Sequence, residues 1–193
     1  NGGILARFAP LSVLLPGMTA TGPTPTDTGI TTIDIALQYD GVADLPTFPL
    51  NLLADLNVVV GGWLHNSYMT DESGYTAEEL AEAINDPANR QTYGDTTYIT
   101  IPAKRLPLLV PFRALGEAIG LSALTTPIAD LIEPTLKVLV ELGYDRSVPY
   151  GQPTGFTMFP TIDVTSVVTQ LRAAGEAGIA AARADIEAPS PNP

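Results

Sequence analysis

Proline divides this chain more sharply than any other residue, because proline lacks a backbone donor and clashes with the preceding turn of a helix. Residues 1–30 contain Pro16-Gly17, Gly22-Pro23 and Pro25, which predicts a long loop over the surface. Residues 106–144 are mostly apolar, and we expect several short helices there rather than one long helix. The prolines that interrupt this segment are Pro107, Pro111, Pro127 and Pro134.

Two segments show the pattern of strands. Residues 31–38 alternate Ile33, Ile35 and Leu37 with polar neighbours, which predicts a strand with these three side chains on its buried face. Residues 96–101 form the second expected strand.

Helical patterns lie between and after these strands. Residues 49–63 predict a helix that starts near Pro49 and buries the apolar positions recurring every three or four residues. Thr76-Ala77-Glu78-Glu79 fits a capping box, followed by a short helix that ends before Pro87. Residues 163–186 predict a last helix capped by Asp163. The apolar positions of the first helix are Leu53, Leu56, Val60 and Trp63. Strands mixed with helices in this way predict an α/β fold.

The composition limits what the chain can be. With 193 residues and 45% apolar content, we expect one domain over residues 1–186 and a disordered tail over residues 187–193. The formal net charge of -12 disfavours nucleic acid as a partner. The chain has no cysteine and one histidine, which excludes cysteine-based zinc sites and multi-histidine metal sites. We expect neither a metal nor an organic cofactor. No apolar run is long enough for a transmembrane span.

Acidic residues and the single histidine follow the first expected strand. Asp40 and Asp44 lie just past its end, and His65 follows after one more element. A carboxylate and an imidazole delivered in this order are the acid and base of several nucleophilic hydrolases. No serine lies in a G-x-S-x-G nucleophile elbow; the nearest approach, around Ser122, lacks the second glycine. By spacing alone, His65 fits an ordinary packed or surface residue as well as a catalyst, and Asp40-Gly41 also fits a simple turn.

Five segments of the sequence resemble the ordered motifs of the PE-PPE domain family. The first four are Asn1-Gly2-Gly3-Ile4-Leu5-Ala6-Arg7-Phe8, Gln38-Tyr39-Asp40-Gly41-Val42-Ala43-Asp44-Leu45-Pro46, Tyr98-Ile99-Thr100-Ile101-Pro102 and Leu106-Pro107-Leu108-Leu109. The fifth is Leu142-Gly143-Tyr144-Asp145. The family comprises mycobacterial serine hydrolase-like proteins with distant similarity to cutinases.

The resemblance implies the C-terminal portion of an α/β-hydrolase-like domain, with a helical, proline-rich apolar cap over residues 106–142. It implies His65 as the catalytic base, and Asp44 as the acid in preference to the alternative, Asp40, because Ala43-Asp44-Leu45-Pro46 is similar to the acid turn of cutinases. The serine would lie upstream, in the N-terminal half of the same domain, or on a companion chain.

The function implied is that of a serine esterase or acyltransferase acting on acyl esters of lipids or glycolipids, secreted or in the cell envelope. Water as acceptor gives an esterase, and a sugar or lipid hydroxyl gives an acyltransferase, so both remain open. We expect part of the apolar cap to line an acyl groove next to His65. The alternative is a non-catalytic binding or scaffold module of the cell envelope, in which the apolar segment contacts a partner.

Overall fold

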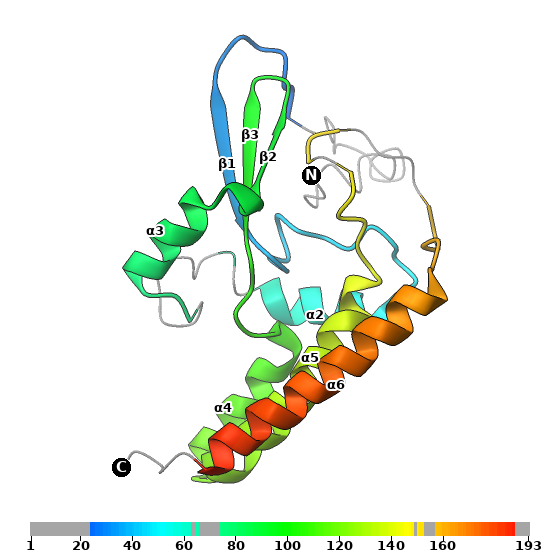
Figure 1. Cartoon of the computed structure of the whole chain (residues 1–193). Coiled ribbons are helices and arrows are strands. Elements are labelled where there is room, and N and C mark those ends of the chain that lie inside the picture. The colour runs from blue at the N-terminus through cyan, green and yellow to red at the C-terminus, as the bar shows by residue number, and fades with distance from the viewer. Residues whose placement is uncertain (1–23, 63–64, 66–73, 149, 153–156, 188–193) are drawn as a thin grey trace, which may run out of the picture.

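The computed structural model describes residues 24–62, 65, 74–148, 150–152 and 157–187. Helices and a small mixed sheet make up this part of the chain, which is compatible with an α/β fold (Figure 1). Residues 1–23 of the predicted loop and residues 188–193 of the predicted tail lie outside the described residues. Glu187, which was expected in the tail, is instead the last residue of a helix that begins at Val164.

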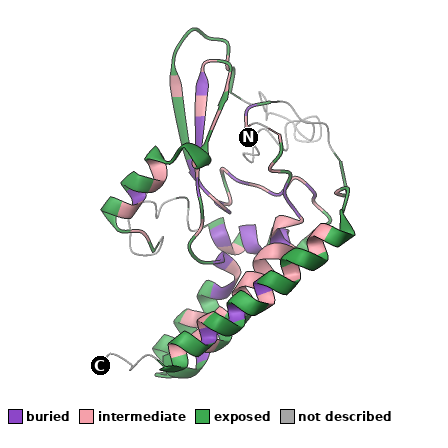
Figure 2. Ribbon diagram, viewed as in Figure 1, coloured by how far each residue is buried: buried purple, intermediate pink, exposed green. Residues whose placement is uncertain are grey.

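The sheet has the strand order β1-β3-β2. Strand β1 (Thr32–Leu37) runs parallel to β3 (Thr96–Ile101), and β2 (Arg90–Tyr93) runs antiparallel to β3. The two strands expected from the sequence are confirmed, whereas β2 was not predicted, because its four residues carry no apolar alternation. β3 is therefore the central strand among the described residues, and its residues are the most deeply buried of the three (Figure 2).

The expected burial of one face of β1 is only partly correct. Leu37 is buried, but Ile33 is 63% exposed and Ile35 is 41% exposed. The reason is that α3 (Ala77–Asn85) packs Leu80 against the C-terminal end of the strands, beside Leu37 and Ile101. Among the described residues nothing buries the other end of this face in the same way.

The helix α3 begins as the sequence predicts. The Thr76 side chain accepts a hydrogen bond from the Glu79 amide, and the Glu79 carboxylate accepts one from the Thr76 amide, so the capping box is complete. The helix ends at Asn85, and the 3-10 helix η4 (Pro87–Asn89) leads into β2.

Helix α2 (Leu52–Gly61) is present, but it starts later than expected and buries a different face. Asn51 caps it, and its buried residues are Ala54, Asn57, Val58 and Gly61, whereas the predicted core residue Leu56 is 51% exposed. The buried face of α2 carries small residues because the backbone at Tyr39 and Gly143 packs directly against it. A Cβ on Gly143 would lie 2.4 Å from the Ala54 Cβ, and one on Gly61 would lie 2.4 Å from the Tyr39 carbonyl oxygen.

The proline-containing segment is less broken than the sequence predicts. The 3-10 helix η5 (Pro107–Leu109) and α4 (Val110–Ala118) are short, but α5 (Ser122–Glu141) continues for 20 residues through Pro127 and Pro134. An internal proline costs a helix about 3 kcal/mol, which packing must offset.

The packing that offsets this cost comes from α6 (Val164–Glu187), which lies along α5 (Figure 1). The buried side of α6 carries Ala174, Gly178 and Ala182 at intervals of four residues, so the two helices approach closely. The predicted last helix is thus confirmed to within a residue or two, with Asp163 capping its first amides. Among the described residues, none of the helices is both long and apolar enough to cross a bilayer.

Candidate active site

The candidate acids lie in one tight turn after β1. Tyr39 has a φ of 66°, in the left-handed region that non-glycine residues rarely adopt. The Asp44 amide donates to the Asp40 carbonyl oxygen at 2.8 Å, which closes the turn. The side chains of Asp40 and Asp44 are both buried, but they have different partners.

Asp40 is the carboxylate that meets the histidine. The Asp40 Oδ2 lies 2.9 Å from the His65 Nδ1, and Oδ1 accepts hydrogen bonds from the amides of Val42 at 2.8 Å and Ala43 at 3.2 Å. The Asp40 side chain is fully buried, whereas the imidazole is 45% exposed. A carboxylate at Nδ1 favours the tautomer in which Nδ1 carries the proton and Nε2 is basic. This is the arrangement of an oriented general base.

Close backbone contacts hold this turn against α2. A Cβ on Gly41 would lie 2.8 Å from both the Gly62 Cα and the Val58 carbonyl oxygen, so any other residue would push the turn away from the end of the helix. His65 lies three residues after Gly62, the residue that caps the C-terminal end of α2. The glycines at 41 and 61 therefore set the distance between the Asp40 turn and the chain that carries His65.

Asp44 is bound by an arginine instead. The Arg146 Nη1 lies 2.6 Å from the Asp44 Oδ1, and Nη2 lies 3.0 Å from Oδ2, a bidentate pair. The Asp44 Oδ2 also accepts a hydrogen bond from the Tyr39 amide at 2.9 Å. The Nε of the same arginine donates to Glu141 at 3.1 Å. Both oxygens of Asp44 thus serve a structural network that joins the turn after β1 to the end of α5.

The charges in this network shift one another's pKa. Burial alone would raise the pKa of Glu141, but the hydrogen bonds and charge of Arg146 outweigh it and hold the pKa below its ordinary value. Burial alone would lower the pKa of Arg146, but Asp44 and Glu141 raise it. Arg146 also stacks over the Tyr144 ring at 4.0 Å from the centroid. The guanidinium is therefore a permanent positive charge that neutralises the buried carboxylate of Asp44 and the partly buried carboxylate of Glu141.

The structure thus brings His65 together with the alternative acid, Asp40. It does not bring His65 together with Asp44, which was favoured because its turn resembles the acid turn of cutinases. Sequence reasoning also missed Arg146, because 102 residues separate it from Asp44 and no local pattern marks it. Among the described residues, no group of three or more His, Cys, Asp or Glu side chains could hold a metal ion.

Comparison with known proteins agrees with the motifs. A model of the PE-PPE domain matches residues 1–145. An uncharacterised PPE family protein, PPE42, of Mycobacterium tuberculosis is 39% identical over 99% of this chain and 31% of its own length. Esterase PE16 of the same species is 42% identical over 90% of this chain and 31% of its own length. A more distant relative, diacyltrehalose acyltransferase Chp2, is 28% identical over 74% of this chain and 38% of its own length.

The chain spans less than a third of the length of PPE42 and esterase PE16. No solved structure matches it at a significant level. The family match covers the turn with both aspartates, His65 and the whole of residues 106–142, so the chain belongs to the PE-PPE domain family.

Proposed function

We propose that this chain supplies the base, His65, and its orienting carboxylate, Asp40, to a serine esterase or acyltransferase that acts on acyl esters of lipids or glycolipids. The observation that carries the proposal is the 2.9 Å contact between the fully buried Asp40 carboxylate and the His65 Nδ1. Family membership supports it, because relatives are named an esterase and acyltransferases.

In the proposed mechanism, a serine hydroxyl attacks the acyl carbonyl while the His65 Nε2 takes its proton. The same nitrogen then gives that proton to the departing alcohol, which leaves the acyl group bound to the serine. In the second half, His65 takes a proton from water or from an acceptor hydroxyl, and that oxygen attacks the acyl group. The proton finally returns to the serine oxygen. Asp40 keeps the imidazole in the required tautomer and stabilises its positive charge.

The proposed source of the serine is a segment outside the motifs of this chain. No serine here lies in a G-x-S-x-G elbow, and PPE42 and esterase PE16 are each about three times as long as the chain. We place the serine in the N-terminal half of the same domain, with residues 1–186 as the C-terminal portion; a companion chain is the second source. We place the activity outside the cytoplasm or in the cell envelope, as membership of the family suggests.

The helical segment is proposed as a cap with a narrower role than the sequence predicts. Leu106 and Leu109 are buried, and Leu106 is part of the core beside Tyr39 and Val140, so these leucines do not line a groove. Other large apolar side chains of the segment stay exposed, from α4 through the link between α4 and α5 to the middle of α5; they include Leu115, Ile119, Leu121 and Leu124. These four are the proposed contacts for acyl chains, because each buried methylene contributes about 0.8 kcal/mol.

The test compares the two aspartates in the longer protein that contains the serine. We expect His65→Ala and Asp40→Asn each to lower turnover of a p-nitrophenyl ester by a factor on the order of 10⁴, as loss of the orienting carboxylate does in other triads. Both variants should keep the circular dichroism spectrum of the unmodified protein.

Asp44→Asn is the matched control, because it removes a buried carboxylate four residues away that contacts Arg146 rather than His65. Its effect should appear in stability, with turnover per folded molecule changed less than about tenfold. The assignment fails if Asp44→Asn silences a folded enzyme while Asp40→Asn leaves turnover nearly intact. If neither aspartate nor His65 affects turnover, the chain has a binding or scaffold role instead.

A further inference from the structure

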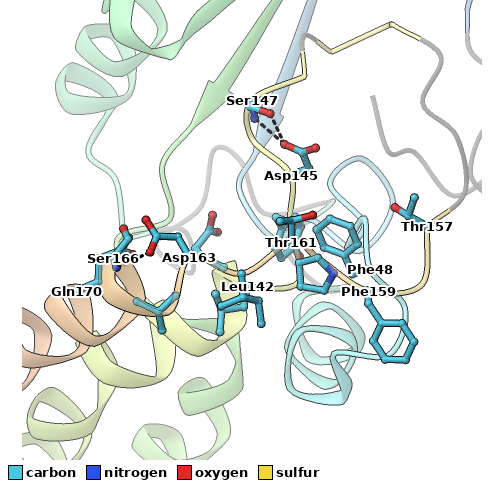
Figure 3. A pocket seen from close by; sticks show the side chains of 15 residues that line it. Phe48, Leu142, Asp145, Ser147, Thr157, Phe159, Thr161, Asp163, Ser166 and Gln170 are labelled. Carbon is cyan, nitrogen blue, oxygen red and sulfur yellow. Dashed lines mark hydrogen bonds between the residues drawn. The ribbon is translucent and has the colours of Figure 1, made fainter.

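A cavity of about 540 Å³ lies beside the end of α5, and Figure 3 shows side chains that line it. The end of α5, the loop after it, residues 157–163 and the first turns of α6 surround the cavity, and neither His65 nor Asp40 lines it. Its volume falls within the range of about 300–1,000 Å³ typical of sites for small molecules. Nothing in the proposed mechanism uses it.

The lining excludes several classes of ligand. The described residues that line the cavity include Asp145, Asp163 and Glu141, which is paired with Arg146, and none of these lining residues is a lysine, arginine or histidine. In a chain with a formal net charge of -12, such a lining repels phosphate, sulfate and fatty-acid carboxylate groups. A wholly apolar ligand is disfavoured too, because it would take the Asp145 and Asp163 carboxylates out of water, and only local hydrogen bonds would replace that water. The remaining candidates are neutral polar molecules and organic cations.

The hydrogen bonds at the two aspartates favour a ligand with hydroxyl groups. The Asp145 Oδ1 accepts from the amide and the hydroxyl of Ser147 at 3.0 and 2.5 Å, and the Asp163 Oδ1 accepts from the amides of Thr165 and Ser166 at 3.0 and 3.2 Å. Every hydrogen bond that the described residues donate to these carboxylates goes to Oδ1. Both Oδ2 atoms are therefore left as acceptors, and Figure 3 shows the two carboxylates on different sides of the cavity.

Hydroxyl and aromatic side chains complete the lining. Four lining side chains carry a hydroxyl that can both donate and accept a hydrogen bond: Ser147, Thr157, Thr161 and Ser166. Such hydroxyls match a ligand with hydroxyl groups better than a ligand with an ammonium group, because an ammonium group only donates. Phe159 lines the cavity although it is 71% exposed, and its flat face can cover the C–H face of a sugar ring. Carboxylate acceptors, hydroxyls and an exposed aromatic ring together suit a carbohydrate.

We propose that this cavity binds a neutral polyhydroxylated ligand, such as a sugar unit. The binding itself does not depend on the proposed enzyme activity. That the bound sugar is the head group or the acceptor of the acyl-transfer reaction rests on the proposed function. Glu141 connects the two regions, because it lines the cavity and binds Arg146, which holds Asp44 in the turn that also carries Asp40.

The experiment titrates this chain with maltose and follows backbone amide chemical shifts. We expect saturable shifts at Ser147 and Ser166 with a Kd of about 1–10 mM, the range of weak binding to an open site. Phe159→Ala and Asp163→Asn should each weaken binding at least about fivefold. Asp163→Asn keeps a helix cap, since asparagine caps as well as aspartate. Met158→Ala, an exposed neighbour outside the lining, is the matched control and should leave the Kd unchanged.

Three outcomes overturn the proposal. The first is the absence of saturation with maltose up to about 100 mM. The second is a saturable shift that Phe159→Ala and Asp163→Asn leave unaltered. The third is saturation at the same amides by tetramethylammonium chloride but not by maltose, which would assign the cavity to a cation. Because the measurement needs no turnover, maltose binding by a His65→Ala chain supports this site whatever the outcome for the proposed catalysis.

Discussion

At the residue scale, two aspartates four positions apart differ in their partners, Asp40 contacting His65 and Asp44 contacting Arg146. Asp40 meets a half-exposed imidazole, as a catalytic carboxylate would, whereas both oxygens of Asp44 are occupied by Arg146 and a backbone amide. When both oxygens of a buried carboxylate already accept hydrogen bonds from a guanidinium, neither oxygen is available to orient a histidine. Arg146 is therefore a structural requirement of the turn that positions Asp40.

Replacing Arg146 with methionine should lower the free energy of unfolding by about 3 kcal/mol, because it leaves the buried Asp44 and the partly buried Glu141 without their positive charge. Arg146→Met combined with Asp44→Asn should cost less than the sum of the single changes, since the two residues act as a pair. Urea denaturation measures both. Arg172→Met, on the exposed side of α6, is the control and should change stability by less than about 0.5 kcal/mol. Equal losses at positions 146 and 172 would contradict the structural role of Arg146.

At the scale of elements, the closely packed pair α5 and α6 explains how a helix tolerates two internal prolines. A Cβ on Gly178 would lie 2.1 Å from the Leu131 carbonyl oxygen, so this glycine allows the backbones of the two helices to approach. Gly175 lies on the same helix, but a Cβ there would have no neighbour within 4 Å. An alanine at position 175 would therefore change only helix propensity, whereas an alanine at position 178 would also disturb the packing of α6 on α5.

We expect Gly178→Ala to destabilise the chain by about 1–3 kcal/mol, because the added methyl group forces α6 away from α5. Gly175→Ala should instead stabilise it by about 0.5–1 kcal/mol, since alanine favours a helix over glycine and the methyl group enters open space. Thermal unfolding followed by circular dichroism at 222 nm measures both effects. A stabilising Gly178→Ala would show that α6 does not lie as close to α5 as described here.

At the scale of the whole molecule, the exposed part of β1 suggests where the rest of a longer protein packs. Ile33 and Ile35 are exposed on a strand that pairs on one side with β3, and the chain spans 31% of the length of PPE42. Apolar side chains on an edge strand are usually covered in a soluble protein. We propose that the N-terminal half of the domain covers them.

Ile33→Lys should therefore change the free energy of unfolding by less than about 0.5 kcal/mol in this 193-residue chain, where the side chain is exposed. In the longer protein the same substitution should cost about 1–3 kcal/mol, because a charge would replace a buried apolar group. Chemical denaturation of the two proteins side by side provides the comparison. An equal effect in both would mean that this part of β1 stays exposed and that the upstream segment packs elsewhere.

The sequence by itself determined the features that depend on residues within a few positions of one another. It predicted the capping box at Thr76, the strands around Ile35 and Ile99, and the start of α6 after Asp163. It also indicated the family, and it placed two aspartates and a histidine after the first strand. These features follow from hydrogen bonds along the backbone and from side-chain periodicity, which a local pattern records.

Only the tertiary structure decided which groups meet across long stretches of chain. It brought His65 to Asp40 over 25 residues and Arg146 to Asp44 over 102 residues, and no local pattern distinguishes these pairs from the alternatives. It also selected the small-residue face of α2 over the face with Leu56, and it kept α5 continuous through Pro134. In each case the free energy of packing against distant elements outweighs the local preference, so the local sequence alone could not predict the outcome.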